Sequence, residues 1–295
     1  MGVDAGGTST VAALSRGAVY ESTARGGPAN PSSLGAAAAC EEISATVRAL
    51  VSETDPHSLF VAAAGTGRSA LREGLAAALR AAFPKTPHLV VEDDARVALR
   101  GALPEGPGAV LIAGTGSVAY AENGERSARV GGAGYLLGDE GAAFWLGMGA
   151  AKLLARVYDG RAAGDETTAL VARALEAPDR DTLLAAVYDR PLDVARIASL
   201  APAIIAFAGK GNRTSTKLVQ SAGQELGDLV KSAVRRVGLA DASPAIVFAG
   251  GLLRENSLLS FLLETRVTSD VPGASVLRLR DEPALTALRF AEALH

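Results

Sequence analysis

The sequence GVDAGGTST, at residues 2–10, says more about the fold of this chain than any other stretch. A short strand reaches the acidic residue Asp4, and two glycines and three hydroxyl residues follow soon after it. This order suits a tight hairpin turn whose backbone N–H groups point at phosphate oxygens. Asp4 can hold a magnesium ion through water, because Mg²⁺ keeps several waters and needs few carboxylates. Taken alone, the stretch fits an ordinary β-hairpin turn equally well.

Two later stretches repeat the pattern of a buried strand that ends in small residues. VLIAGTGS, at residues 110–117, ends in Gly-Thr-Gly-Ser, and a hairpin there would clamp a polyphosphate if it faced the first one. IVFAGG, at residues 246–251, precedes a helix expected from about Asn256. Its glycines allow a base or ribose to lie against the backbone, although a plain strand–helix joint fits as well. We call residues 6–9, 114–117 and 249–251 the first, second and third glycine turns.

The rest of the chain predicts an α/β architecture. Short apolar runs at residues 11–14, 59–63, 89–92 and 109–113 predict buried strands, with helices at 34–52 and 69–82 between them. From residue 139 the pattern is mainly helical, with helices expected at residues 144–158, 167–175, 182–188, 194–208 and 214–237. Strands return at residues 245–248 and 276–279, and a helix at 283–294 closes the chain. Residues 17–31 and 101–108 are expected to be loops, and residues 64–68, AGTGR, a structural turn.

Composition excludes several classes of function. The chain has 295 residues, with 29 basic and 32 acidic side chains and no basic block, so nucleic acid is not an expected partner. Its single cysteine, Cys40, cannot form an internal disulfide or a cysteine-based metal site. No apolar run of about 18 residues and no signal-peptide pattern is present, so we expect a soluble, cytoplasmic protein that binds no membrane. The P-loop, dinucleotide-binding and nucleophile-elbow motifs are absent from the sequence.

Two acidic constellations follow strand or loop ends. Glu92-Asp93-Asp94 closes one predicted strand and opens a helix, which is where α/β sheets place chemistry. One carboxylate there can cap the helix while the other faces a ligand. GGAGYLLGDEG, at residues 131–141, is a glycine-dense loop that ends in an acidic pair. Asp139 suits the hydroxyls of a sugar, and capping of the following helix is an equally compatible role.

Taken together, these motifs resemble one protein family. DAGGT at residues 4–8 resembles the first phosphate motif of the actin/hexokinase/Hsp70 superfamily, GTGS at 114–117 its second phosphate motif, and AGG at 249–251 its adenosine motif. GDEG at residues 138–141 is similar to a stretch of the N-acetylglucosamine kinases and the BadF/BadG-like ATPases. The ordered set is far more specific than any single turn.

The resemblance implies an α/β fold of two ribonuclease-H-like, actin-like ATPase domains with ATP and sugar in an interdomain cleft. We place these domains at residues 1–117 and 118–295, with the last helix, about 283–294, packing back on the first domain. The implied activity is transfer of the γ-phosphate of ATP, with Mg²⁺, to the primary hydroxyl of an amino sugar. N-acetylglucosamine is the first candidate for that small-molecule substrate, and the oligomeric state stays open, a homodimer included.

Carried over position by position, the resemblance assigns roles to single residues. Asp94 falls on the catalytic base, which accepts the proton of the attacking hydroxyl. The expected metal ligand is Asp4. The expected ATP and phosphate contacts are Gly6, Gly7, Thr8, Ser9, Gly114, Thr115, Gly116, Ser117, Ala249, Gly250 and Gly251. The expected sugar contacts are Asn30, in GPAN at residues 27–30, with Asp94, Thr115, Gly116, Gly132 and Asp139.

The sequence departs from the family at two positions. Animal N-acetylglucosamine kinases carry a tryptophan where Ala133 stands, which leaves the acetyl pocket open to question. Only three residues precede Asp4, fewer than in relatives, so we expect the natural start to lie upstream.

Two rival functions remain from the sequence. An ATPase that activates a partner enzyme through an iron–sulfur cluster would need two cysteines from each subunit, and Cys40 stands alone. A non-catalytic nucleotide or sugar sensor is less favoured by the acidic set of Asp4, Asp94 and Asp139.

Overall fold

The computed structural model describes residues 1–17, 19–51, 54–189, 191–253, 257–279 and 281–294. Within it the chain forms two compact units. Unit 1 comprises Met1–Glu105 and Leu279–His295, and unit 2 comprises Gly106–Arg278. The chain therefore passes from unit 1 to unit 2 once and returns once near its end.

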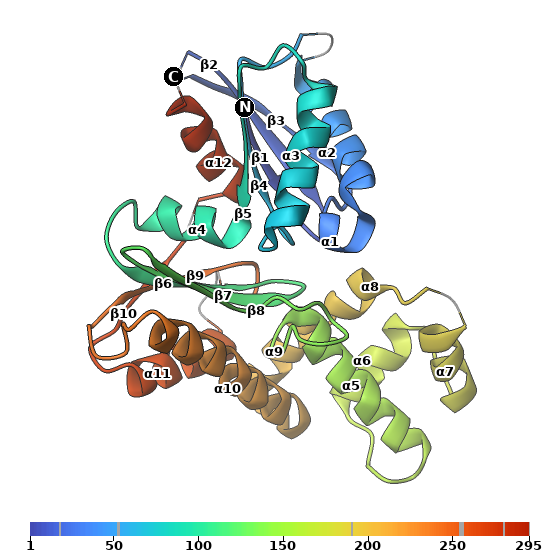
Figure 1. Cartoon of the computed structure of the whole chain (residues 1–295). Helices are drawn as coiled ribbons and strands as arrows, with labels where there is room; N and C mark the ends of the chain where they lie inside the picture. The colour runs from blue at the N-terminus through green and yellow to red at the C-terminus, as the bar shows by residue number, and fades with distance from the viewer. Residues whose placement is uncertain (18, 52–53, 190, 254–256, 280, 295) are drawn as a thin grey trace. The chain divides into compact units, whose positions relative to one another are not determined.

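Unit 1 is built on a five-stranded mixed sheet with the order β3-β2-β1-β4-β5 (Figure 1). Strands β1 (Gly2–Ala5), β4 (Ser58–Ala63) and β5 (His88–Asp93) run parallel, so their carboxyl ends meet at one edge. Strands β2 (Thr10–Arg16) and β3 (Val19–Gly26) continue the sheet as an antiparallel hairpin.

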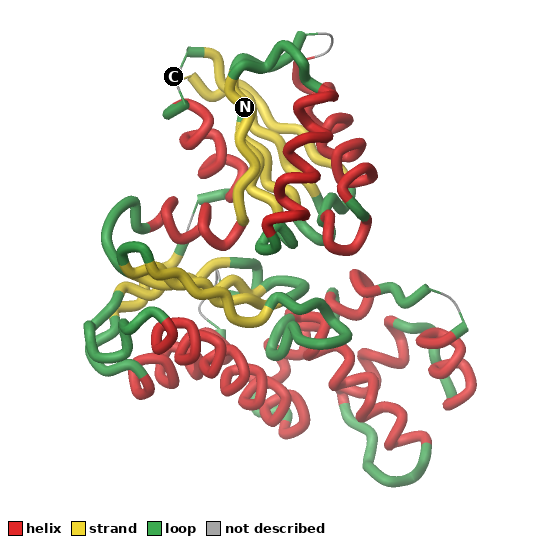
Figure 2. The backbone as a smooth tube through the Cα atoms, in the orientation of Figure 1, coloured by secondary structure: helices red, strands yellow, loops and turns green. Residues whose placement is uncertain are grey.

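Helices cover both faces of this sheet (Figure 2). On one face, Val3, Ala5 and Val61 pack with the buried side chains of α2 (Ala36–Val51) and α3 (Ser69–Ala82). On the other, Phe60 and Ala62 pack with α12 (Pro283–Glu292). Alternate residues of one strand thus enter opposite cores, as the period of a pleated strand requires. Two shorter helices, α1 (Pro31–Leu34) and α4 (Asp94–Ala102), follow β3 and β5.

Unit 2 has a second five-stranded mixed sheet with the order β10-β9-β6-β7-β8. Its strands are β6 (Gly108–Ala113), β7 (Ser117–Asn123), β8 (Arg126–Gly131), β9 (Ala245–Ala249) and β10 (Ser275–Arg278). Its helices are α5 (Ala143–Tyr158), α6 (Glu166–Ala174), α7 (Arg180–Tyr188), α8 (Val194–Ala198), α9 (Ala201–Gly209), α10 (Arg213–Arg236) and α11 (Leu258–Asp270).

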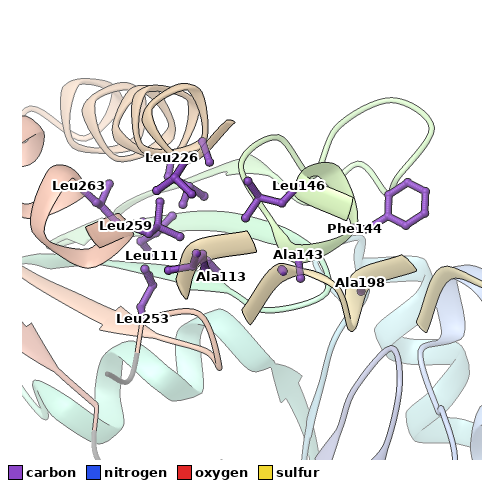
Figure 3. Close-up of a cluster of buried hydrophobic side chains, with 14 of the residues drawn as sticks. Leu111, Ala113, Ala143, Phe144, Leu146, Ala198, Leu226, Leu253, Leu259 and Leu263 are labelled. Atoms are coloured by element: carbon purple, nitrogen blue, oxygen red, sulfur yellow. The ribbon is translucent and has the colours of Figure 1, made fainter. Parts of the chain in front are cut away.

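The core of unit 2 joins its sheet to its helices (Figure 3). Leu111 of β6 lies with Leu226 of α10 and with Leu259 and Leu263 of α11, and all four side chains are fully buried. Leu146 extends the same cluster into α5. The second and third glycine turns therefore stand at strand ends that a large core holds in place.

The structure differs from the sequence-based expectations at several elements, among them the following. Residues 17–31 were expected to be a loop, but β3 occupies most of them; this edge strand is largely exposed and therefore carries no apolar run. The helix expected at 194–208 is broken at Ser199 and Leu200 into α8 and α9. The domain boundary was placed at residue 117, whereas the units divide between Glu105 and Gly106, because β6 and β7 pair as one hairpin. The helix start expected near Asn256 lies outside the described residues.

Among the described residues, no single helix has the length and apolar character needed to cross a membrane. One bent pair, Val194–Gly209 with Arg213–Arg236 at 112°, passes the same test by length and composition only.

Candidate functional site

The first glycine turn stands at the carboxyl edge of the unit 1 sheet. It follows β1 directly and is closed by a hydrogen bond from the Gly6 N–H to the Ser9 carbonyl at 2.9 Å. Gly7, Thr8 and Ser9 are exposed. Because Ala5 pairs with Ala63, and Ala63 with Asp93, the ends of β1, β4 and β5 lie in one row. The turn is thus placed two strands away from the acidic end of β5.

Asp4 is half-buried at the end of β1, in register with Ala62 of β4, which is itself in register with Glu92 of β5. No group of three or more His, Cys, Asp or Glu side chains that could hold a metal occurs among the described residues. A magnesium ion held at Asp4 would therefore take its other ligands from water and from a nucleotide's phosphates, as Mg²⁺ commonly does. A single carboxylate beside an exposed turn fits that ion.

Asn30 is tied closely to the first glycine turn. The Ala29 N–H, one residue earlier, donates to the Gly6 carbonyl at 3.0 Å. The Asn30 side chain caps α1, because its Oδ1 accepts from the Ser32 N–H at 2.8 Å. The backbone of Gly65 lies against Oδ1 so closely that a Cβ there would collide with it. Within the described part of the chain, the structure records no acceptor for Asn30 Nδ2, so this amide retains a donor for a ligand.

The two aspartates between β5 and α4 have separate environments. Asp93 is buried, with 5% of its surface exposed, and caps α4 by accepting from the Ala95 N–H at 2.9 Å. Asp94 is half-exposed in the first turn of α4, and its Oδ1 also accepts from the Ala95 N–H at 2.9 Å. Asp93 can satisfy the helix end alone, so the solvent-accessible carboxylate is Asp94.

The second glycine turn joins β6 to β7 and is held by α5. The Gly114 N–H donates to the Gly116 carbonyl at 2.9 Å. The first N–H groups of α5, those of Ala143 and Phe144, donate to the carbonyls of Gly114 and Thr115 at 2.9 and 3.2 Å. The start of α5 therefore fixes the carbonyl side of the turn, which suits a rigid phosphate-binding backbone.

Asp139 completes the same turn from a loop 22 residues away. Its Oδ1 accepts from the Ser117 N–H at 3.1 Å, and its carboxylate leaves no room for a side chain at Gly116, where a Cβ would stand 2.7 Å away. Asp139 has a φ of 59°, a left-handed conformation that aspartate tolerates better than most residues. Burial raises the pKa of this carboxyl above its ordinary 3.8, while the Ser117 hydrogen bond opposes the rise.

The capping role considered for Asp139 is wrong. Helix α5 begins at Ala143, its N-cap residue is Ala142, and no side chain caps it. The carbonyls of Gly114 and Thr115 satisfy those N–H groups instead. Asp139 thus holds the second glycine turn, not the helix.

The third glycine turn follows β9 and lies against the end of β6. Gly250 has a φ of 90° and approaches the carbonyl of Ala113 so closely that no Cβ fits there. The Leu252 N–H donates to that carbonyl at 3.1 Å. Because β6 and β9 are parallel neighbours, the second and third turns meet at one edge of the unit 2 sheet.

Gly132 connects the exposed loop at residues 132–137 to this edge. Its N–H donates to the Ser117 carbonyl at 2.8 Å, and its φ is 68°. The side chain of Arg129 lies beside it, since a Cβ on Gly132 would stand 3.0 Å from the guanidinium. Gly132, Ser117 and Asp139 therefore form one hydrogen-bonded group.

Comparison with known proteins identifies the family to which this chain belongs. Residues 1–284 match the BadF/BadG/BcrA/BcrD ATPase family. This chain belongs to that family. It is 27% identical over 204 residues to the N-acetylmuramic acid/N-acetylglucosamine kinase of Clostridium acetobutylicum, covering 69% of this chain and 67% of that protein. It is also 27% identical over 187 residues to the N-acetyl-D-glucosamine kinase of Dictyostelium discoideum, covering 62% and 59%.

The fold agrees with the same relationship. A candidate N-acetylglucosamine kinase from Chromobacterium violaceum superposes with a TM-score of 0.77 at 23% identity, covering 98% of this chain and 97% of that one. The two five-stranded mixed sheets of this BadF/BadG/BcrA/BcrD family member thus belong to the two-domain fold of actin-like ATPases.

The residues singled out in the sequence gather into one group on each unit of this family member. Unit 1 holds Asp4, Asn30, Asp94 and the first glycine turn, and unit 2 holds Gly132, Asp139 and the other two turns. Sequence reasoning missed two residues beside these groups. Arg129 lies next to Gly132, and Glu42 binds the backbone of Gly27. Neither residue belongs to a motif, so the sequence points only to the glycines that they contact, Gly132 and Gly27.

Proposed function

We propose that this chain is an ATP-dependent kinase that phosphorylates the primary hydroxyl of an amino sugar, with N-acetylglucosamine as the first substrate to test. Membership of an ATPase family supports the nucleotide, and the names of the two curated relatives support the sugar. A sensor that binds only a nucleotide would not require polar side chains that bind sugar hydroxyls.

The observation that carries the proposal is the division of roles between Asp93 and Asp94. A general base must reach the proton of the attacking hydroxyl, so its carboxylate must be accessible to a ligand. Asp93 caps α4 and is buried, which leaves the half-exposed Asp94 at the same strand end for the base. The proton of the sugar hydroxyl passes to the Asp94 carboxylate as the oxygen attacks the γ-phosphorus.

Phosphoryl transfer asks mainly for positioning and for neutralisation of charge. The backbone N–H groups of the first and second glycine turns hold the phosphates in this proposal, and the third turn contacts the adenosine. Mg²⁺ near Asp4 supplies charge neutralisation on the phosphate oxygens when it is bound. The rigid support of the second turn by α5 and Asp139 supports its assignment, because preorganised donors stabilise developing charge most.

The sugar is bound in this proposal by Asn30, Thr115, Gly116, Gly132 and Asp139. Asn30 offers an amide donor, since its Oδ1 is occupied by the cap of α1. Asp139 has one carboxylate oxygen committed to Ser117, and carboxylates accept several hydrogen bonds. Asn30 thus offers a donor, and Asp139 an acceptor, to the hydroxyls of a sugar.

The alternative of an enzyme activator with an iron–sulfur cluster has no support in the side chains. The single cysteine, Cys40, is buried in α2 with 8% of its surface exposed and packs in the core of unit 1. A cluster shared between subunits needs accessible thiolates.

The test is the initial rate of ADP formation with a panel of hexoses and hexosamines. We expect slow ATP turnover alone and a sharp increase with an N-acetylated amino sugar, because a kinase suppresses transfer to water. Equal turnover with and without every sugar of the panel would rule out the kinase.

A further inference from the structure

The loop that carries Asn30 is anchored by a side chain outside every motif. Side chains form hydrogen bonds with both the N–H and the carbonyl of Gly27. The Gly27 N–H donates to Oε1 of Glu42 on α2 at 2.5 Å, and the Gly27 carbonyl accepts from the buried Thr10 hydroxyl at 2.8 Å. We call residues 27–30 the asparagine loop.

The same loop is joined to the first glycine turn. The Ala29 N–H donates to the Gly6 carbonyl at 3.0 Å, and Ala29 is fully buried. Thr10, which holds Gly27, is the first residue of β2 and directly follows that turn. Three anchors, on α2, on β2 and on the turn, therefore fix the path of the chain into Asn30.

Glu42 anchors the asparagine loop but is not needed to pack α2 against the core. Helix α2 is held in unit 1 by its buried residues Ala39, Ile43 and Val47, whereas Glu42 is half-exposed. Helix and loop are nevertheless in tight contact, because a Cβ on Gly26 would collide with the carboxylate of Glu42. A carboxylate that accepts a backbone N–H is a strong, directional contact.

We infer that Glu42 is a positioning residue for sugar recognition, which holds the asparagine loop so that the Asn30 amide meets the sugar hydroxyl. The predicted change in the KM for sugar rests on the proposed function. The predicted anchoring of the asparagine loop by Glu42 does not. Glutamine keeps an acceptor oxygen at this position, so a neutral hydrogen bond from the Gly27 N–H can replace the charge-assisted one.

The experiment compares Glu42→Ala and Glu42→Gln with Glu41→Ala, the exposed neighbour on the same helix. Loss of one hydrogen bond is worth up to about tenfold in binding, so we expect the KM for sugar to rise several-fold to about tenfold in Glu42→Ala, with kcat changed by less than about twofold. Glu42→Gln and Glu41→Ala should keep the KM of the parent enzyme. Equal KM values in Glu42→Ala and the parent, or equal damage in Glu42→Gln, would overturn the inference.

A second readout does not depend on kinase activity. Hydrogen exchange of the peptide that covers residues 27–30 should accelerate in Glu42→Ala and stay unchanged in Glu42→Gln and Glu41→Ala, at equal melting temperatures of the core. Unchanged exchange in Glu42→Ala would refute the anchor. Accelerated exchange in an enzyme without sugar-dependent turnover would instead contradict the proposed function and leave the anchor standing.

Discussion

At the scale of single residues, Asn30 has one side-chain atom that caps a helix and another that we propose binds the sugar. Its Oδ1 caps α1, and its amide nitrogen faces no recorded acceptor among the described residues. Asn30→Asp keeps the capping oxygen and removes the donor. We expect a folded variant whose KM for sugar is raised about ten- to a hundredfold, because a hydroxyl is left unpaired, while the KM for ATP stays near normal. Steady-state kinetics with each substrate varied in turn tests this.

The control for Asn30 is the alanine variant. Asn30→Ala loses the cap as well, so it should also lose about 0.5–2 kcal/mol of unfolding free energy. Normal sugar binding in Asn30→Asp would place the sugar elsewhere.

Asp139 gives a prediction about pH. Burial raises its pKa above 3.8 in the folded state, so the folded protein holds this proton more tightly than the unfolded chain does. The contribution of Asp139 to stability is therefore greatest below about pH 3.8 and falls as the pH rises through the raised pKa. Asp139→Asn carries no such titration. We expect the unfolding free energy of the variant, relative to the parent, to increase from about pH 3.8 upward and then level off.

Urea unfolding across a pH series measures that difference. A difference that is flat, or that decreases with pH, would contradict the burial of a charged Asp139. The KM for sugar should rise in the same variant, because one acceptor of the proposed sugar site changes its chemistry.

Local chemistry explains why some of these residues are visible in the sequence and others are not. Glycines that stand beside acidic and hydroxyl residues predict turns, because a turn depends on the backbone conformation of a few consecutive residues. The partner of Asp139 is Ser117, 22 residues away, and that contact depends on how the loop folds back. Glu42 likewise meets Gly27 through packing of α2 on β3, for which no motif exists.

At the scale of elements, the proposed roles of Asp93 and Asp94 at the junction of β5 and α4 separate stability from catalysis. Asp94→Asn should lower kcat by at least about a hundredfold, the usual effect of losing a general base, with ATP affinity little changed. Asp93→Ala should instead lower the unfolding free energy by about 0.5–2 kcal/mol, because it removes the cap of α4. Chemical quench and thermal unfolding of both variants give the two readouts. The opposite pattern would assign the base to Asp93.

Elements with a strong apolar period were predicted well, and those without one were not. The buried strands β4 and β6 lie within one residue of the expected ranges, since continuous apolar runs mark them. The exposed edge strand β3 has no contrast between apolar and polar positions, so its sequence predicts a loop. The break between α8 and α9 at residues 199–200 was missed because both helices keep apolar side chains on the same core.

At the scale of the whole molecule, α12 returns to unit 1 and completes its core. Leu288 is buried, with 4% exposed, and packs with Ala13 of β2. Leu288→Ala should cost about 2–5 kcal/mol of unfolding free energy through the cavity it leaves. The control is the neighbouring exposed Arg289→Ala, which removes a surface ion pair with Asp281 and should cost less than about 1 kcal/mol. Equal effects in the two variants, in denaturant unfolding, would show that α12 adds little to this core.

The central claim is that a phosphoryl group passes from ATP to a sugar hydroxyl, and the product composition tests it most directly. Phosphorus NMR of a reaction with ATP, Mg²⁺ and N-acetylglucosamine measures ADP, inorganic phosphate and sugar phosphate together. The account predicts one sugar phosphate, esterified at the primary hydroxyl, for each ADP formed. The same reaction with the 6-deoxy sugar should yield neither product above the background rate. ADP accompanied by an equal amount of inorganic phosphate, with no sugar ester, would contradict it.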